Sequence, residues 1–239
     1  MVTALVVALV GLTACGGGGG GDSGGKATSE AAGSWRPMSA GPLSGRSSVP
    51  VWTGREMVVW GGGSCKANPC QGDNVQPLAD GAAYDPAADT WRRIAPSPLS
   101  ARSDALTVWS GKEVLVWGGE SWTEAFADGA AYDPATDRWR PLAAGPLKAR
   151  IGFAHAWTGK EVLMWGGTPG TFNNYFADGA AYDPAGNRWR ALPTTSGRLA
   201  EGVWTGQELL VWGGIVPAPG GGRQTTPIQS AADGYRLTP

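Results

Sequence analysis

Short apolar runs separated by turn residues recur along most of the chain. Four of them read MVVW, VLVW, VLMW and LLVW, and each is preceded by a Trp-(Thr/Ser)-Gly segment and followed by Gly-Gly. A run that is apolar at every position is typical of a strand buried on both faces. Because glycine can take a positive φ, the Thr-Gly or Ser-Gly pair predicts a two-residue hairpin that joins this strand to the preceding one.

A second phrase follows each of the first three runs after a variable loop. It reads ADGAAYDPAADTWR at 79–92, ADGAAYDPATDRWR at 127–140 and ADGAAYDPAGNRWR at 177–190. Tyr-Asp-Pro predicts a turn, since Pro presets φ and Asp can bond its own backbone. A third strand then ends at this turn and a fourth begins at the Trp, so each unit predicts four antiparallel strands and the phrase is mainly scaffold.

The tryptophans that close the apolar runs lie 57, 48 and 47 residues apart, at Trp60, Trp117, Trp165 and Trp212. A period of about fifty residues is that of kelch blades. A sheet with two apolar faces must pack between neighbouring sheets around an axis, and twelve of the thirteen tryptophans recur at three fixed places in the unit. Large rings therefore supply a core between the sheets.

The Gly-Gly doublets, followed by Tyr and then by Trp seven positions on, resemble the kelch motif of galactose-oxidase-type propellers across residues 34–239. The resemblance implies an all-β fold, a kelch-type β-propeller, and the ends of the repeat region predict four blades of four antiparallel strands each. Residues 34–38 match a fourth strand, and the last unit stops at 232–237 with no Trp after it. We therefore expect a closed monomer in which the N-terminal strand completes the final blade; a dimer of half-rings and a natural fragment are the alternatives.

Composition agrees with short strands joined by tight turns, with 39 glycines, 18 prolines and 13 tryptophans. The formal charge of -1 and the lack of a Lys/Arg run argue against nucleic-acid binding. One histidine is too few for a copper site of the galactose-oxidase type, and phosphate-loop, serine-elbow and zinc spacings are missing from the sequence. We expect no cofactor and no metal.

The N-terminal residues 1–14 form an apolar segment too short to span a bilayer, and Cys15 follows Leu-Thr-Ala directly. This resembles a bacterial lipoprotein signal, which implies lipidation at Cys15 and a place on the extracytoplasmic face of the cell membrane; signal cleavage without a lipid is the alternative. Residues 15–33 are Gly-rich and predict a flexible tether. In an oxidising compartment Cys65 and Cys70 are expected to form a disulfide.

The loops between strands two and three are the least repeated part of the chain, and variable loops on a repeated frame commonly carry binding. Aromatic rings beside amides suit stacking on a sugar or gripping a peptide, although the same rings could simply pack the loops down. The candidate ligand-binding residues here are Trp122, Phe126, Phe172, Asn173, Asn174 and Tyr175.

An arginine recurs before the first strand of every unit, and an aspartate recurs at the start of every third strand. The arginines could form an anion-binding ring at one mouth of the channel. Alternatively, the two sets form Arg-Asp pairs that tie the blades together. The positions are Arg46, Arg102, Arg150 and Arg198, with Asp80, Asp128, Asp178 and Asp233.

Asp104, His155 and Glu201 are unrepeated polar residues on the innermost strands, and they are weak candidates for an acid/base cluster. The alternative is scattered channel lining with water. The leading functional hypothesis is a non-enzymatic, membrane-anchored module that binds an extracytoplasmic protein or glycan. A small carbohydrate-active enzyme, resembling kelch sugar epimerases or lyases, and a structural cell-surface spacer are the alternatives.

Overall fold

The computed structural model describes residues 34–66, 74–170, 174–217 and 228–239. The first sheet has the order β1-β2-β5-β6, and every neighbouring pair in it is antiparallel. We call this sheet blade 1, and it consists of β1 (Val51–Trp52), β2 (Met57–Trp60), β5 (Gly81–Asp85) and β6 (Thr90–Arg93).

Two further four-stranded sheets and one three-stranded sheet repeat this order. Blade 2 consists of β7 (Leu106–Trp109), β8 (Val114–Trp117), β9 (Gly129–Asp133) and β10 (Arg138–Pro141). Blade 3 consists of β11 (Ala154–Trp157), β12 (Val162–Trp165), β13 (Gly179–Asp183) and β14 (Arg188–Leu192). Blade 4 consists of β15 (Gly202–Trp204), β16 (Leu209–Trp212) and β19 (Gly234–Leu237).

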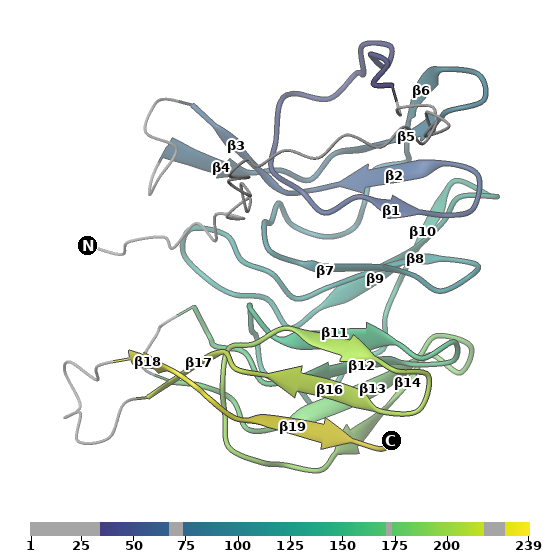
Figure 1. Cartoon of the computed structure of the whole chain (residues 1–239). Helices are drawn as coiled ribbons and strands as arrows, with labels where there is room; N and C mark the ends of the chain where they lie inside the picture. Colours follow the sequence, from purple (N-terminus) through teal and green to yellow (C-terminus); the bar gives the residue numbers. More distant parts are fainter. Residues whose placement is uncertain (1–33, 67–73, 171–173, 218–227) are drawn as a thin grey trace, which may run out of the picture.

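Two small hairpins extend from the blades. They pair β3 (Gly63–Cys65) with β4 (Val75–Pro77) and β17 (Ile215–Pro217) with β18 (Ile228–Ser230). The all-β prediction of repeated antiparallel sheets is confirmed, and the sheets are arranged as the blades of a β-propeller (Figure 1).

The hairpin between the first two strands of a blade differs from the sequence prediction by one residue. In blade 2 the paired residues Trp109 and Val114 enclose a loop in which Gly111 has a φ of 90°. The Ser110 hydroxyl accepts a hydrogen bond from the Glu113 amide, at 2.9 Å. The central turn residues are therefore Gly111 and Lys112, and Ser110 closes the turn from outside instead of forming part of it.

The predicted scaffold role of the Tyr-Asp-Pro phrase agrees with its contacts. In blade 2 the Tyr132 hydroxyl donates to Asp137, at 2.6 Å, across the turn between β9 and β10. The Asp133 carboxylate accepts from the Ala135 amide, at 2.9 Å. The same phrase in blades 1 and 3 makes the same tyrosine contact, to Asp89 and to Asn187.

The apolar core lies between consecutive blades. Trp117 of β8 is 1% exposed and packs against Phe153 and Trp189 of blade 3, with ring centroids 5.5 and 5.8 Å apart. Trp60 of blade 1 makes the same kind of contact with Trp139 of blade 2, at 5.7 Å. These tryptophans pack one blade onto the next, as the fixed spacing predicted.

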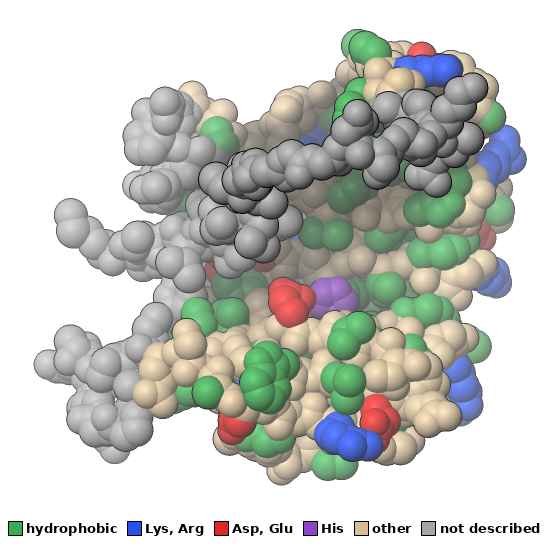
Figure 2. Space-filling model, viewed as in Figure 1, with side chains coloured by type: hydrophobic (Ala, Val, Ile, Leu, Met, Phe, Trp, Pro, Cys, Tyr) green, Lys and Arg blue, Asp and Glu red, His purple; other side chains and the backbone are tan. Residues whose placement is uncertain are grey.

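Closure of the ring by the N-terminal strand is not seen in the part of the chain that the structure describes. Ser34–Met38 form no strand, Trp35 is fully exposed, and blade 4 has three strands. Blades 1 and 4 lie at opposite ends of the array (Figure 1). Hydrophobic side chains lie on the surface over β16 and β19 (Figure 2), and Trp212 is 74% exposed.

The predicted signal segment, the tether and Cys15 lie outside the described residues. Within the described ranges, no helix is long and apolar enough to cross a membrane. Cys65 at the end of β3 is disulfide-bonded, and its expected partner Cys70 lies outside the described residues.

Candidate functional site

The variable loops that connect the second and third strands of the blades leave the array on one side. The β3–β4 and β17–β18 hairpins project on the same side in Figure 1, because both follow a Gly-Gly doublet at the end of a second strand. The corresponding loops of blades 2 and 3 begin after Gly119 and Gly167. We call this side the loop face.

Gly119 shows why the doublet is needed where a loop leaves its blade. Its φ is 86°, and a Cβ on it would lie 2.5 Å from the Ser103 carbonyl oxygen. Only glycine permits both the left-handed backbone and this close approach. The doublet therefore brings the start of the blade 2 loop against the segment that enters β7.

Trp122 is the most exposed of the described aromatic candidates on the loop face. The residue is 45% exposed, while its Nε1 donates to the carbonyl oxygen of Val75 in β4. The loop around it is a tight turn, closed by a hydrogen bond from the Ser121 amide to the Glu124 carbonyl, at 2.8 Å. Trp122 thus joins the loops of blades 1 and 2 and still presents part of its ring to a ligand.

The other aromatic candidates are less available. The guanidinium group of Arg102 lies 4.1 Å from the centre of the Phe126 ring, so Phe126 packs its own loop onto the blade. Tyr175 is half-buried, and burial raises the pKa of its hydroxyl. Asn174 beside it is exposed. Phe172 and Asn173 lie outside the described residues.

The four repeated arginines make the contacts expected for Arg-Asp pairs. Arg102 is fully buried and donates to the Gly118 carbonyl oxygen at 3.0 Å and to Asp128 at 2.8 Å. Its own carbonyl accepts from the Gly62 amide of blade 1, at 2.9 Å. The ion pair therefore lies within one blade, and the tie to the neighbouring blade runs through the backbone.

The same pairing recurs at the three other positions, with ion-pair distances of 2.7 to 2.9 Å, in Arg46–Asp80, Arg150–Asp178 and Arg198–Asp233. The Arg150 side chain is fully buried, and those of Arg46 and Arg198 are 5% and 2% exposed. An open anion-binding ring needs guanidinium groups that face solvent. These contacts favour the structural alternative for all four arginines.

The three weak acid/base candidates occupy separate surroundings. Asp104 is exposed, has a φ of 54°, and accepts from the Ser103 hydroxyl at 2.9 Å. His155 lies half-buried in β11, with Nδ1 3.3 Å from the Phe153 carbonyl oxygen. Glu201 is exposed just before β15. No hydrogen bond or ion pair among the described residues joins any two of these three side chains.

Glu120 is a further candidate that sequence reasoning missed. It follows the Gly-Gly doublet of blade 2 and exchanges backbone hydrogen bonds with Ser103, at 2.9 Å. Burial, together with the nearby charge of Asp104, raises the pKa of its carboxyl group to about 7. A carboxyl group of this kind can hold or release a proton near neutral pH.

A signal for Glu120 was present in the sequence. The residue after the doublet is Gly63, Thr168 or Ile215 in the other units, so Glu120 places a single acid at a repeated, partly buried position. A charged carboxylate at a partly buried position costs free energy unless a cation or hydrogen-bond donors pair with it, so an acid retained there is a candidate functional group. Across the described ranges, no group of three His, Cys, Asp or Glu residues could hold a metal ion.

Comparison with known proteins bears on the fold. No protein-family model matches the chain, and no curated protein matches its sequence. Among solved structures it is similar to that of YjhT, a kelch-type propeller protein, with a TM-score of 0.61 and 16% sequence identity. The match covers 76% of this chain and 63% of YjhT, so the chain spans less than two thirds of that protein's length. This similarity shows that the repeated sheets form a propeller-type fold.

Proposed function

We propose that the protein is a kelch-type propeller module, anchored by lipid to the extracytoplasmic face of the cell membrane, that binds a protein or a glycan through its loop face. The motif arrangement supports the kelch assignment, and the apolar segment ending at Cys15 supports the anchor. The binding role is supported by a contrast within the blades, since their strands and turns are repeated closely and their loops are not.

Trp122 is the single observation that carries the proposal. A tryptophan ring buries a large apolar area at low entropic cost, and its flat face suits a sugar or a peptide side chain. Trp122 is held in place by its hydrogen bond to Val75, so its ring is positioned before a ligand arrives. Tyr175 and Asn174 add an aromatic ring and an exposed amide from the loop of blade 3.

Site-specific photo-cross-linking on intact cells tests the binding surface. A photoreactive residue at position 122 should form a covalent adduct with a partner, whereas the same residue at Lys112, on a hairpin tip in blade 2, should not. A glycan array probed with the purified protein covers the case of a sugar ligand. The variants Trp122→Ala and Tyr175→Ala should lose binding without a change in melting temperature, and Trp122→Phe, which keeps an aromatic ring, should retain it.

Absence of both an adduct and a glycan signal would contradict the binding role and favour the structural spacer.

The lipid anchor at Cys15 is tested by a separate experiment. Replacement Cys15→Ser should move the protein from the membrane fraction to the soluble fraction and abolish incorporation of labelled palmitate. Unchanged membrane association with no label in the wild type would rule out lipidation.

A small carbohydrate-active enzyme is a second candidate function, favoured by the Asp104–Glu120 pair. A carboxyl group with a raised pKa beside a second carboxyl group can act as a general acid. Turnover in a screen of neutral and acidic glycans that is lost in Glu120→Gln and retained in Glu201→Gln would support it. No turnover on any glycan would reject it.

A further inference from the structure

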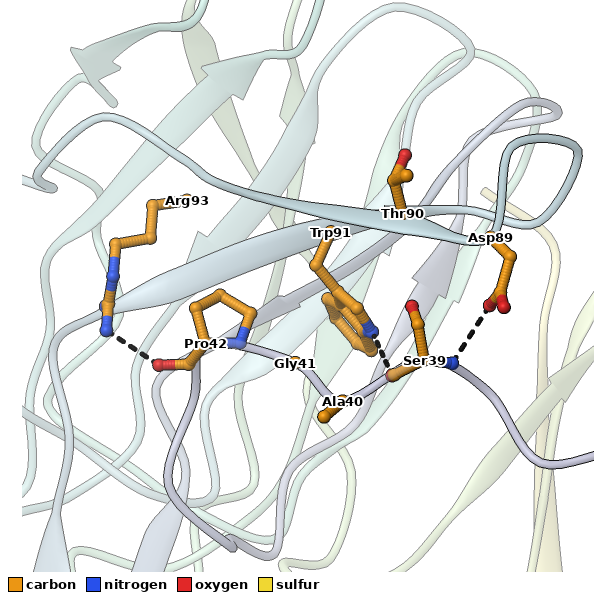
Figure 3. A pocket seen from close by; sticks show the side chains of 8 residues that line it. All are labelled: Ser39, Ala40, Gly41, Pro42, Asp89, Thr90, Trp91 and Arg93. Atoms are coloured by element: carbon orange, nitrogen blue, oxygen red, sulfur yellow. Dashed lines mark hydrogen bonds between the residues drawn. The ribbon is translucent and has the colours of Figure 1, made fainter.

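The segment Ser39–Pro42 lies on the outer side of blade 1, where a preceding blade would contact it. The Trp91 Nε1 donates to the Ser39 carbonyl oxygen at 3.0 Å, and the Ser39 amide donates to Asp89 at 2.9 Å. Arg93 donates to the Pro42 carbonyl oxygen at 2.6 Å. Figure 3 shows Trp91 and Arg93 of β6 reaching this segment along the side of the blade.

Blades 2 and 3 make the same pair of hydrogen bonds to the blade before them. Trp139 donates to the Ala95 carbonyl oxygen at 2.9 Å, and the Ala95 amide donates to Asp137 at 3.0 Å. Trp189 of blade 3 contacts Ala143 in the same way, at 2.8 Å. Ala95 and Ala143 each follow the fourth strand of the preceding blade, so Ser39 occupies the place of a residue that follows a fourth strand.

The residues before Ser39 match that fourth strand. Trp35-Arg36-Pro37-Met38 aligns with Trp91-Arg92-Arg93-Ile94, yet 34–38 form no strand and Trp35 is fully exposed. Blade 4 has no strand beside the outer edge of β19 in the described part of the chain. Residues 34–38 thus have the sequence of a fourth strand without forming one, and among the described residues the outer edge of β19 is unpaired.

A charge on each side matches this pairing. In blades 1 to 3 the arginine after the fourth-strand tryptophan forms an ion pair with a glutamate before the second strand, at 2.6 to 2.7 Å, in Arg92–Glu56, Arg140–Glu113 and Arg190–Glu161. The counterpart of this arginine in the N-terminal segment is Arg36. The counterpart of the glutamate in blade 4 is Glu208, whose two carboxylate oxygens accept from Arg236 of β19 at 2.8 and 2.9 Å, so Arg36 would share this carboxylate with Arg236.

The end face of the array at blade 4 is apolar and open. Trp212 of β16 is 74% exposed, whereas its counterparts Trp60, Trp117 and Trp165 are 1 to 4% exposed. Trp60 and Trp117 are covered by the fourth-strand tryptophan of the next blade, so Trp212 has the shape and chemistry to receive a tryptophan equivalent to Trp91. Val203 on β15 is 61% exposed as well.

The segment before Ser39 is short, since five extended residues span at most about 17 Å. Ser39 is fixed on blade 1 by its hydrogen bonds to Trp91 and Asp89. Blade 4 lies at the opposite end of the array, with blades 2 and 3 between it and blade 1 (Figure 1).

We propose that the partner of these two end faces is a second copy of this chain. In the dimer the N-terminal strand of each copy pairs with β19 of the other, and Arg36 of each copy binds Glu208 of the other. Trp212 of one copy packs on Trp91 of the other. The two junctions are equivalent, as in a two-fold dimer, and eight blades lie within the range of known propellers. Strand exchange covers both sheet edges and both apolar faces at once.

A charge exchange between two tagged copies tests the proposal on the full chain in mild detergent. Two wild-type copies with different affinity tags should co-purify after co-expression. Two copies of Arg36→Glu should co-purify at least tenfold less, because both junctions then place the new glutamate at position 36 against Glu208. Two copies of Glu208→Arg should also co-purify at least tenfold less, because both junctions then place two arginines together. One copy of each variant should co-purify as the wild type does, since both junctions of this mixed dimer carry opposite charges.

Rescue in the mixed pair separates exchange between copies from closure within one chain, because a closed monomer cannot be repaired by a second variant. The matched control is Arg55→Glu, on an exposed side chain in the β1–β2 hairpin, which should leave co-purification unchanged. Circular dichroism and thermal melting of each variant confirm that the blades remain folded. A wild-type protein that is monomeric by light scattering, or single variants that co-purify as well as the wild type, would overturn the proposal.

Discussion

Replacement of Arg102 by Ala should lower the free energy of unfolding by about 3–5 kcal/mol, because carbonyl oxygens lose their donor and a packed side chain is removed. Arg102 was a candidate ligand-binding residue in the sequence, but its side chain is fully buried within blade 2. The substitution therefore distinguishes the two roles, because a ligand-binding arginine would contribute to affinity and little to stability.

The magnitude follows from the contacts that the guanidinium group makes. The Gly118 carbonyl oxygen accepts from it at 3.0 Å in a buried hydrogen bond, and a buried acceptor left without a donor costs about 1–3 kcal/mol. The Ser100 carbonyl oxygen also accepts at 3.0 Å, but this bond is only partly buried, so its loss costs less. Stacking on Phe126 contributes about 0.5–2 kcal/mol. The Asp128 side chain is 60% exposed, so water can replace its lost partner and the carboxylate adds little.

Urea or thermal unfolding followed by tryptophan fluorescence measures the effect. A loss of about 3–5 kcal/mol corresponds to a fall in melting temperature of about 6–20 °C for a domain of this size. The matched variant Asp128→Asn should cost about 0–1 kcal/mol, as expected for an exposed ion-pair partner. A cost below about 1 kcal/mol for Arg102→Ala, with loss of binding to a partner, would refute the structural role.

Two further predictions concern single residues on blade 2. The pKa of Glu120 is raised to about 7 in the folded protein against 4.5 as its ordinary value, so folding favours its protonated form, and stability should fall as pH rises from about 4.5 to 7. Because Glu120 is partly exposed, the loss should be about 1–2 kcal/mol, and Glu120→Gln should flatten that slope in urea titrations between pH 4.5 and 7.5. Gly119→Ala should destabilise the protein by more than about 3 kcal/mol, because its Cβ would meet the Ser103 backbone, whereas Gly111→Ala, with a similar φ and open space around it, should cost about 1–2 kcal/mol. Equal costs for the two glycine variants would show that backbone contact is not the cause.

Local structure was predictable because the same pattern of apolar runs and turn residues occurs in four units of the sequence. The runs MVVW and VLVW became β2 and β8 at the predicted residues, and Tyr132 turned the outer hairpin through a neighbouring aspartate. The hairpin at Ser110 was misplaced by one residue, since a serine can close a turn through its hydroxyl as well as form part of it. Propensity alone does not separate these two uses.

The site was less predictable because a residue that recurs in every blade can serve either ligand binding or the stability of the fold. Four arginines at equal positions could have lined a channel mouth, and only their burial and their contacts to Asp128 and its counterparts favour the structural role. Glu120 was missed for the opposite reason. Glu120 is the one acid among the residues that follow the four Gly-Gly doublets. Its raised pKa depends on burial and on the nearby charge of Asp104, and neither can be read from the sequence.

Closure of the ring depends on the angle between neighbouring blades, and no residue pattern in one unit encodes that angle. The angle arises from how side chains such as Trp117 and Trp189 fill the space between two sheets, summed over every interface. The matching end segments, Trp35-Arg36 and β19, are equally compatible with a strand from the same copy or from another. The exposed Trp212 shows that the end face of blade 4 is uncovered, and blades 1 and 4 lie at opposite ends of one copy (Figure 1), which favours a strand from another copy.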